Sequence, residues 1–284
     1  MLSIHSDEQV HGPQLAPRHQ AELSFVFAYP MAFTHAYNMS ILQLSPGINM
    51  EHRNVRGKIA YIHDPEGERR DFGREWWSVT FHEDGQRTLR AHCEIEPGVV
   101  ADRSVLRETV YTTDRDYRPL DCFVRLHESG KFLGSGWFRF TDAGAECEAV
   151  NVTAGRTSQR MDLATPPLSF GAHPVSCDVL HCARFDHSSQ LNPQPCRVVL
   201  MSSPEHDGCS GPSLCSIKFD LEYLGREEVT VPAGTFETDH YRFLLDHHPA
   251  EDVWCTTDGF LFVKITVGGY MNAHFDLVEY DEQY

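Results

Sequence analysis

The sequence is poor in positive charge. Its 284 residues include 24 lysines and arginines against 41 aspartates and glutamates, which gives a formal net charge of −17 with histidine neutral. Nucleic-acid affinity depends largely on lysine and arginine neutralising phosphates, so this balance argues against a nucleic-acid partner. Anionic membrane surfaces also attract basic segments, and the sequence therefore predicts no membrane partner either.

Long hydrophobic runs are also missing. No window approaches the ~18 uninterrupted apolar residues of a membrane-spanning helix. The residues after Met1 have neither the basic start nor the apolar centre of a secretory signal. We therefore expect a cytoplasmic protein. The nine cysteines fit this expectation, because an odd number in a long chain favours reduced thiols over a disulfide framework.

Several motifs of known enzyme classes are absent. The sequence has no glycine-rich motif of the dinucleotide-binding or phosphate-binding type. Neither the His-Glu-x-x-His pattern of zinc proteases nor the Gly-x-Ser-x-Gly turn of hydrolases occurs. No Cys-x-x-Cys pair is present for a structural zinc site. These absences predict a protein that uses no cofactor.

The sequence does contain a long series of strand-like segments. Residues 216–223 alternate strictly between apolar and polar side chains. An Asp-Gly turn pair separates the strand-like residues 75–82 and 88–95. Crossover helices, which parallel strands require, are missing. The sequence therefore predicts an all-β fold, an antiparallel meander that forms a strongly curved, lipocalin-like sheet or a single or double barrel.

Four parts can be distinguished along the chain. Residues 1–20 are polar and show neither strand nor helix periodicity, so we expect a flexible N-terminal arm. Residues 21–163 and 196–284 each carry a run of strand signals, and each is predicted to form a half-barrel. Residues 164–195 are rich in proline and contain the one helix-like stretch, at 175–185. We expect a short helical or loop linker there, which acts as a hinge or lid.

Part of the second half resembles known proteins. The segment LGREEVTVPAGTFET at 224–238 is followed by Trp254 and by the turn and lysine-bearing strand DGFLFVK at 258–264. With these features, residues 214–280 resemble bacterial uncharacterised proteins that have a lipocalin-like or lipoprotein-carrier-like curved sheet. The resemblance implies a curved sheet around an apolar pocket, and it transfers no catalytic residue.

The predicted linker carries a first group of candidate site residues. His173, Cys177 and His181 are four residues apart, so they share one face if the segment is helical, and two imidazoles with a thiolate can bind a metal. Without a metal, His173, Asp178 and His181 are candidates for acid–base chemistry on a lid. Alternatively, the segment only caps the structure and satisfies its own backbone.

A second group lies on the predicted strands. A barrel wide enough for a ligand can combine aromatic walls with a few polar groups that orient the guest. The doublet at 76–77 must point its two indole rings to opposite faces of a strand. The predicted substrate-binding residues are Trp76, Trp77, Arg90, Tyr111, Phe123, Trp137, His181 and Tyr270. The alternative for the polar members is an ordinary solvated face.

Four residues are predicted to be catalytic. His173 is the expected acid or base, and Tyr241 or His274 is the expected second proton carrier, since Asp276 on the same strand face can orient the His274 imidazole. Arg139 is a candidate to stabilise a developing oxyanion. An exposed polar face is the alternative for the histidine and aspartate pair.

Three functional hypotheses remain from the sequence alone. The first is a cofactor-independent lyase, hydratase or isomerase that uses acid–base catalysis on a small hydrophobic or aromatic molecule inside the sheet. The second is a non-catalytic carrier of a small hydrophobic molecule. The third is a metal-dependent enzyme that uses His173, Cys177 and His181. An exposed strand edge would also allow a homodimer.

Overall fold

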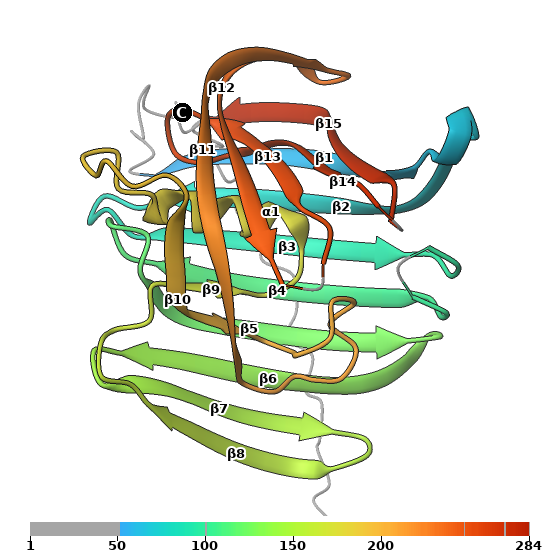
Figure 1. The fold of residues 1–284 in the computed structure, drawn as a ribbon. Coiled ribbons are helices and arrows are strands. Elements are labelled where there is room, and N and C mark those ends of the chain that lie inside the picture. The colour runs from blue at the N-terminus through green and yellow to red at the C-terminus, as the bar shows by residue number, and fades with distance from the viewer. Residues whose placement is uncertain (1–51, 100, 247, 270, 284) are drawn as a thin grey trace, which may run out of the picture. The chain divides into compact units, whose positions relative to one another are not determined.

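A computed structural model of the chain (Figure 1) describes residues 52–99, 101–246, 248–269 and 271–283. All of these residues belong to the unit Asn49–Tyr284. The predicted N-terminal arm at 1–20, the start of the predicted first half-barrel at 21–51, and the candidate residue Tyr270 lie outside the described residues.

Strands make up most of the described chain, which confirms the all-β fold. The strands of the first part are β1 (Arg53–His63), β2 (Arg70–Phe81), β3 (Arg87–Ile95), β4 (Val105–Thr113), β5 (Pro119–Glu128), β6 (Lys131–Thr141), β7 (Gly144–Asn151) and β8 (Gly155–Asp162). The later strands are β9 (Ser169–Gly171), β10 (Gln194–Met201), β11 (Cys215–Val231), β12 (Gly234–Leu245), β13 (Glu251–Thr256), β14 (Phe262–Val267) and β15 (Ala273–Gln283). The helical elements are η1 (Pro65–Gly67), α1 (Val175–Asp178) and η2 (Val179–Arg184). Within the described ranges, none of these helices has the length and apolar content needed to cross a bilayer.

The strands form one sheet with β1 at its middle. On one side of β1 the sheet continues through β2 to β8 in chain order, and on the other side it runs through β15 back to β9. Neighbouring strands pair antiparallel, except β9 with β10. Since β8 and β9 are its two edges, the sheet built by the described residues is unclosed. The predicted strongly curved antiparallel sheet is confirmed, and a closed barrel is not formed.

The sheet curves until one edge lies over the opposite part. The ring of Phe170 on β9 packs against Phe138 and Phe140 on β6, with ring centroids 5.0 and 4.8 Å apart. It also contacts Tyr111 on β4 at 5.8 Å. In Figure 1, β9, β10 and β11 accordingly cross in front of the first strands. The inner faces of the two parts therefore bury each other.

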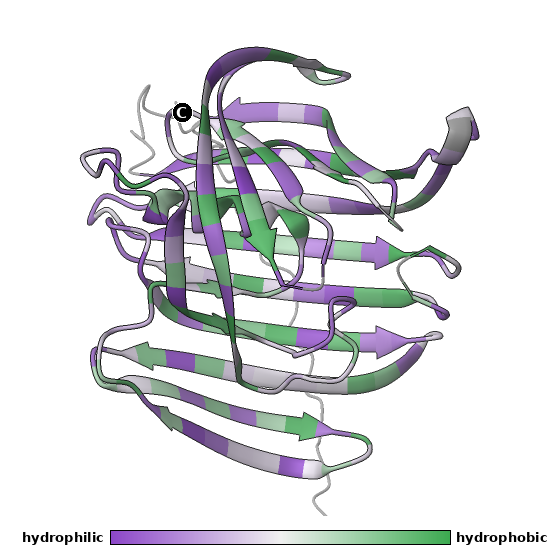
Figure 2. Cartoon of the chain, in the orientation of Figure 1, coloured by the Kyte–Doolittle hydropathy of each residue, from purple (hydrophilic) through white to green (hydrophobic). Residues whose placement is uncertain are grey.

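The inner face follows the alternation of the sequence. On β3, Leu89, Ala91, Cys93 and Ile95 are buried, whereas Arg90 between them is exposed. Figure 2 shows the same change between hydrophilic and hydrophobic positions along many strands. Successive side chains of a strand point to opposite faces, so each strand contributes every second residue to the core.

A bulge bends the longest strand. β11 continues through Gly225, which has a φ of +124° that glycine adopts readily. The pairing of β11 with β12 shifts register between Tyr223 and Gly225. An extra residue on one strand of a pair increases local twist and bending. The bulge therefore helps β11 and β12 to turn over the sheet (Figure 1).

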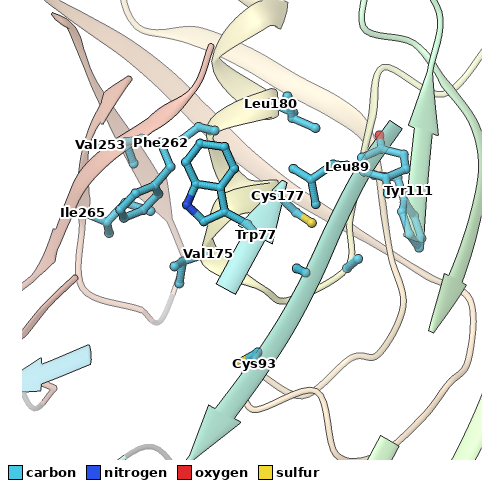
Figure 3. Packing of buried hydrophobic residues seen from close by; sticks show 14 of the residues in the cluster. Trp77, Leu89, Cys93, Tyr111, Val175, Cys177, Leu180, Val253, Phe262 and Ile265 are labelled. Atoms are coloured by element: carbon cyan, nitrogen blue, oxygen red, sulfur yellow. The ribbon is translucent and has the colours of Figure 1, made fainter. Parts of the chain in front are cut away.

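The predicted linker folds inside the curved sheet. Residues 164–195 contain the short helices α1 and η2, which confirms the expected helical or loop character of this segment. Val175 and Cys177 of α1 are buried. Figure 3 shows them near Trp77 of β2 and Phe262 of β14. The two helices thus fill space between the two parts of the sheet, and a role of this segment as a lid remains a prediction.

Candidate functional site

An interior cavity of about 230 Å³ is the candidate site. It is lined by residues of β1 to β4 from the first part of the sheet and of β10 to β15 from the second. The segment that carries α1 and η2, the loop at 203–207, His248 and Met271 contribute the remaining lining. The curvature of the sheet therefore creates the cavity, because only a folded-over sheet brings these strands together.

The walls of the cavity are largely apolar. The aromatic and aliphatic lining includes Phe72, Phe219, Phe243, Phe275, Ile265 and Val267, all of them buried. The rings of Phe219 and Phe243 pack on each other with centroids 5.2 Å apart. Burial of apolar surface is favourable for a ligand as it is for a side chain, so the walls suit the hydrophobic part of a small molecule.

Arg107 brings a charged group into this apolar setting. It belongs to the inward-facing residues of β4 and is only 1% exposed. Its Nη2 donates a hydrogen bond to the carbonyl oxygen of Asp207, and its buried Nε has no hydrogen-bond partner. The guanidinium makes no ion pair with any carboxylate among the described residues. Arg107 is therefore a buried cation without a partner of opposite charge.

The loop opposite Arg107 is shaped by a glycine. Gly208 has a φ of +71°, and a Cβ at this position would collide with the Arg107 guanidinium and lie 3.0 Å from the ring of His173. Only glycine fits both the left-handed backbone and the close approach. The loop can therefore cover Arg107 because residue 208 has no side chain.

Four histidines line the cavity, and two of them, His173 and His181, were candidates from the sequence. Burial, followed by the positive charge of Arg107, lowers the pKa of His173 to about 3. Burial, followed by the charge of Arg184, lowers the pKa of His181 to about 4. The Nδ1 of His181 lies 2.6 Å from Oγ of Ser169. Both imidazoles are therefore neutral near pH 7.

Four acidic residues also line the cavity: Asp178, Glu205, Asp207 and Glu251. Burial raises the pKa of Glu251 to about 7. Burial, with repulsion from Glu251 as the next cause, raises the pKa of Asp178 well above its ordinary value. The Nδ1 of His248 lies 3.4 Å from Oε1 of Glu251. A carboxyl group that titrates near neutral pH can both donate and accept a proton, so Glu251 is suited to acid–base chemistry.

Glu75 on β2 holds the helix that carries Asp178. Its Oε2 accepts hydrogen bonds from the hydroxyl of Tyr61 at 2.6 Å and from the backbone N–H of Val175 at 2.9 Å. Its Oε1 accepts a bond from the backbone N–H of Ser176 at 3.2 Å. The first N–H groups of a helix lack hydrogen-bond partners within the helix. The fully buried carboxyl of Glu75 accepts hydrogen bonds from two of these N–H groups in α1. Burial raises the pKa of Glu75, and the hydrogen bonds oppose this rise in part.

The other predicted catalytic residues lie away from the cavity. The hydroxyl of Tyr241, on β12, lies 3.2 Å from Nε2 of His187. The Nε2 of His274, on β15, is 3.5 Å from Oδ2 of Asp276. Arg139 is exposed on the outer face of β6. The structure therefore brings His173 and His181 together at the cavity but not Tyr241, His274 or Arg139.

The predicted substrate-binding residues divide between two faces. Trp77 and Tyr111 are buried in the core beside α1 and η2, outside the lining of the cavity. Trp76, Phe123 and Trp137 are 39%, 40% and 43% exposed and lie on the outer face. There Trp76, Arg90 and Phe123 line an open hollow of about 790 Å³. The prediction that Phe123 and Trp137 form interior walls is therefore wrong. The face of β5 and β6 that is buried carries Cys122, Val124 and Phe138 instead.

Arg107 and Glu251 were not singled out by the sequence, although each carries a signal. Arg107 alternates with Val105, Thr109 and Tyr111, so it is a charged residue on an otherwise inward-facing row. Glu251 alternates in the same way with Val253 and Cys255. A buried charge is costly unless it is paired. A charged residue in phase with the apolar face of a strand is therefore the pattern that could have found both.

The metal-binding arrangement expected of the linker is not formed. α1 ends at Asp178 and continues as a 3₁₀ helix, and His173 precedes it with a φ of +74°. The spacing of four residues therefore does not place His173, Cys177 and His181 on one helical face. Across the described part of the chain, no group of three or more histidine, cysteine, aspartate or glutamate side chains is placed to hold a metal ion.

Comparison with known proteins shows similarity at the level of fold. No protein-family model matches the sequence, and no curated protein matches it. A β-barrel-like protein of the domain of unknown function DUF1849 from Brucella abortus matches with a TM-score of 0.54 at 10% identity, covering 81% of this chain and 98% of that one. A DUF1089 family protein from Pseudomonas aeruginosa has a TM-score of 0.34 at 10% identity, covering 73% of this chain and 89% of that one.

A third solved structure is more distant. A domain described as an outer-membrane lipoprotein-sorting protein from Vibrio parahaemolyticus has a TM-score of 0.20 at 8% identity, covering 81% of this chain and 85% of that one. Of these three structures, the Brucella protein is the one whose overall fold is similar to that of this chain. Its barrel-like structure confirms the resemblance, noted for residues 214–280, to bacterial uncharacterised proteins with a curved sheet.

Proposed function

We propose that the protein binds a small, largely hydrophobic molecule in its interior cavity. The observation that carries this proposal is the cavity itself, in which aromatic and aliphatic walls surround a few buried ionisable groups. Small-molecule sites have this composition, with apolar walls for affinity and a few polar groups for orientation. The barrel-like fold supports the proposal because it is the curvature of the sheet that encloses the cavity.

The size of the cavity limits the ligand. The cavity has a volume of about 230 Å³. Cavities for drug-sized molecules are larger, on the order of 300–1,000 Å³. The proposed ligand is therefore a single-ring aromatic or a medium-length aliphatic molecule.

Blocking the cavity tests this function. Ile217 is half-buried and lines the cavity from β11, so Ile217→Phe should fill part of the space. We expect 1-octanol to bind the wild-type protein in calorimetry, and Ile217→Phe to weaken this binding at least tenfold. Val229→Phe is the matched control, because Val229 is half-buried on the same strand but outside the cavity lining. Equal binding by the wild type and Ile217→Phe, or no binding of 1-octanol at all, would contradict the proposal.

Acid–base catalysis on the bound molecule is a second candidate function, of the lyase, hydratase or isomerase type. It is favoured by Glu251, whose pKa burial raises to about 7, beside Asp178 and two neutral histidines. The test is to incubate each ligand found by calorimetry with the protein in D₂O and to follow its carbon-bound hydrogens by NMR. Deuterium incorporation that is lost in Glu251→Gln would support catalysis. If the ligands are recovered unchanged and without deuterium, catalysis is contradicted and only the binding function is supported.

Two expectations from the sequence carry over as proposals. The composition supports a cytoplasmic location, and fractionation of cells that express the full chain tests it. An exposed edge strand supports a homodimer, and sedimentation velocity tests that. A membrane-associated pool or a monomer at all concentrations would overturn the respective proposal.

A further inference from the structure

The further inference concerns Arg107 and the charge balance of the cavity, and it rests on the proposed binding function. Arg107 is 1% exposed and lines the cavity. Only its Nη2 has a hydrogen-bond partner among the described residues, the carbonyl oxygen of Asp207. Its buried Nε has none. A guanidinium carries five N–H donors, so most of the donor capacity of this side chain is unused.

The charge of Arg107 also has no close partner within the described chain: four acidic residues line the same cavity, but none of them forms an ion pair with Arg107. A buried cation is unfavourable unless an anion or several acceptors surround it. The neighbouring His173 is neutral near pH 7, because burial, followed by the charge of Arg107, lowers its pKa to about 3. Burial raises the pKa of Asp178 well above its ordinary value, whereas the charge of Arg107 lowers it. Arg107 is therefore a buried cation without an ion-pair partner in a largely apolar part of the cavity.

The backbone around Arg107 adopts conformations that make room for its guanidinium group. The loop residue Gly208 has no side chain where a Cβ would strike the guanidinium. His173 is held beside it with a φ of +74°, and its buried Nε2 makes no hydrogen bond of good geometry. A residue other than glycine in this left-handed region is uncommon and is often found at binding sites. The buried Nε of Arg107, which has no hydrogen-bond partner among the described residues, thus adjoins a cavity whose backbone is shaped around it.

We propose that the ligand is a small amphipathic anion, whose carboxylate or phosphate pairs with the guanidinium of Arg107 while its apolar part lies against Phe219, Phe243 and Phe275. A guanidinium binds either anion through parallel N–H···O bonds. The pairing supplies the missing negative charge, and it supplies acceptors for the unused donors. The aromatic walls supply the contact for the remaining atoms of the ligand.

A comparison of head groups on the unmodified protein tests this inference. Octanoate, octyl phosphate, 1-octanol and octylamine share one alkyl chain and differ in charge, and calorimetry at pH 7.5 measures each of them. We expect octanoate or octyl phosphate to bind at least tenfold tighter than 1-octanol, and octylamine to bind most weakly. The better of the two anions identifies the head group. Equal affinity for anion and alcohol, or tighter binding of octylamine, would overturn the inference.

A substitution series locates the anion. Arg107→Gln should reduce the affinity for the preferred anion at least tenfold and leave the affinity for 1-octanol within twofold. Arg156→Gln is the matched control, because this arginine is exposed on β8 far from the cavity lining. A preference for anions that survives in Arg107→Gln would overturn the assignment of the head group to Arg107. If Arg107→Gln does not fold, the head-group comparison on the wild-type protein still decides the inference.

The two proposals fail in different ways. If none of the four probes binds, the proposed binding function itself is contradicted. If 1-octanol binds as tightly as the anions, the cavity binds small hydrophobic molecules, and only the inference about charge is wrong.

Discussion

The hydrogen bonds of Glu75 lead to a quantitative prediction about stability. Its carboxyl accepts three bonds, from the hydroxyl of Tyr61 and from the first two N–H groups of α1. Glu75→Ala removes the acceptor and leaves three buried donors. Each orphaned donor costs ~1–3 kcal/mol, and water entering the space left by the side chain offsets part of this. We therefore expect a loss of about 3–5 kcal/mol in the free energy of unfolding, which is among the largest effects of single substitutions.

Urea denaturation at pH 7, followed by tryptophan fluorescence and circular dichroism together, measures this change. Glu75→Gln keeps one carbonyl acceptor and the volume of the side chain. Its free energy of unfolding should therefore fall by less, about 1–3 kcal/mol. Glu94→Ala is the matched control, because Glu94 pairs with Arg74 on the outer face at 2.6 Å. An exposed ion pair contributes less than ~1 kcal/mol. A loss for Glu75→Ala no larger than that for Glu94→Ala would refute the assigned role of Glu75.

Three further predictions concern the polar side of the cavity. Gly208→Ala should destabilise the protein by about 1–3 kcal/mol in thermal unfolding, because a Cβ there is strained and strikes Arg107. The control Gly155→Ala, at a similar φ of +70° with open space around it, should cost less stability. Equal losses of stability in the two variants would contradict the close approach of Gly208 to Arg107. Ser169→Ala should cost about 1–3 kcal/mol by leaving Nδ1 of His181 without a partner, whereas Ser158→Ala on the exposed β8 should be nearly neutral in the same assay. Burial raises the pKa of Glu251 to about 7, above the ~4.3 of an unfolded chain, so its favourable contribution is complete below about pH 4 and is lost as the pH rises to about 7. The free energy of unfolding of Glu251→Gln, relative to that of the wild type, should therefore rise by up to about 3 kcal/mol between pH 4 and pH 8. If the difference in unfolding free energy between the two proteins does not change with pH, the raised pKa is contradicted.

Local sequence patterns were sufficient to predict most strands. Alternation on β3, with Leu89, Ala91 and Cys93 in phase, predicts both the strand and its buried face. The tryptophan doublet behaves as the period of two requires, since Trp77 is 4% and Trp76 is 39% exposed. Such signals are local, because they depend only on neighbouring residues.

The pairing of strands that are distant in the sequence could not be predicted from such local patterns. β1 pairs with β15 from Asn54 opposite Gln283 to His63 opposite Ala273, and no pattern within either strand names its partner. The folding of β9 over β6 likewise depends on contacts such as that of Phe170 with Phe138. The curvature of the sheet could be expected in general, whereas its unclosed form could not.

The candidate site shows the same limit. Two strand faces that both carry aromatic residues cannot be assigned to the inside by alternation alone, which is why Phe123 and Trp137 were expected at the cavity. Arg107 becomes a site residue only when the loop with Gly208, about 100 residues later in the chain, closes over it. His173 and His181 were identified from their spacing of four residues with Cys177 in a helix-like segment, although the α-helix formed there is shorter than predicted and does not include His173.

The most direct test of the central claim is to locate a bound molecule on the protein. NMR with ¹³C-labelled octanoate and protein with labelled aromatic side chains measures which rings lie close to the alkyl chain. If octanoate binds in the cavity, nuclear Overhauser contacts are expected from its alkyl chain to the rings of Phe219, Phe243 and Phe275, which line the cavity. Contacts to Trp76, Phe123 or Trp137 instead would place the ligand on the outer face of the sheet and contradict the account.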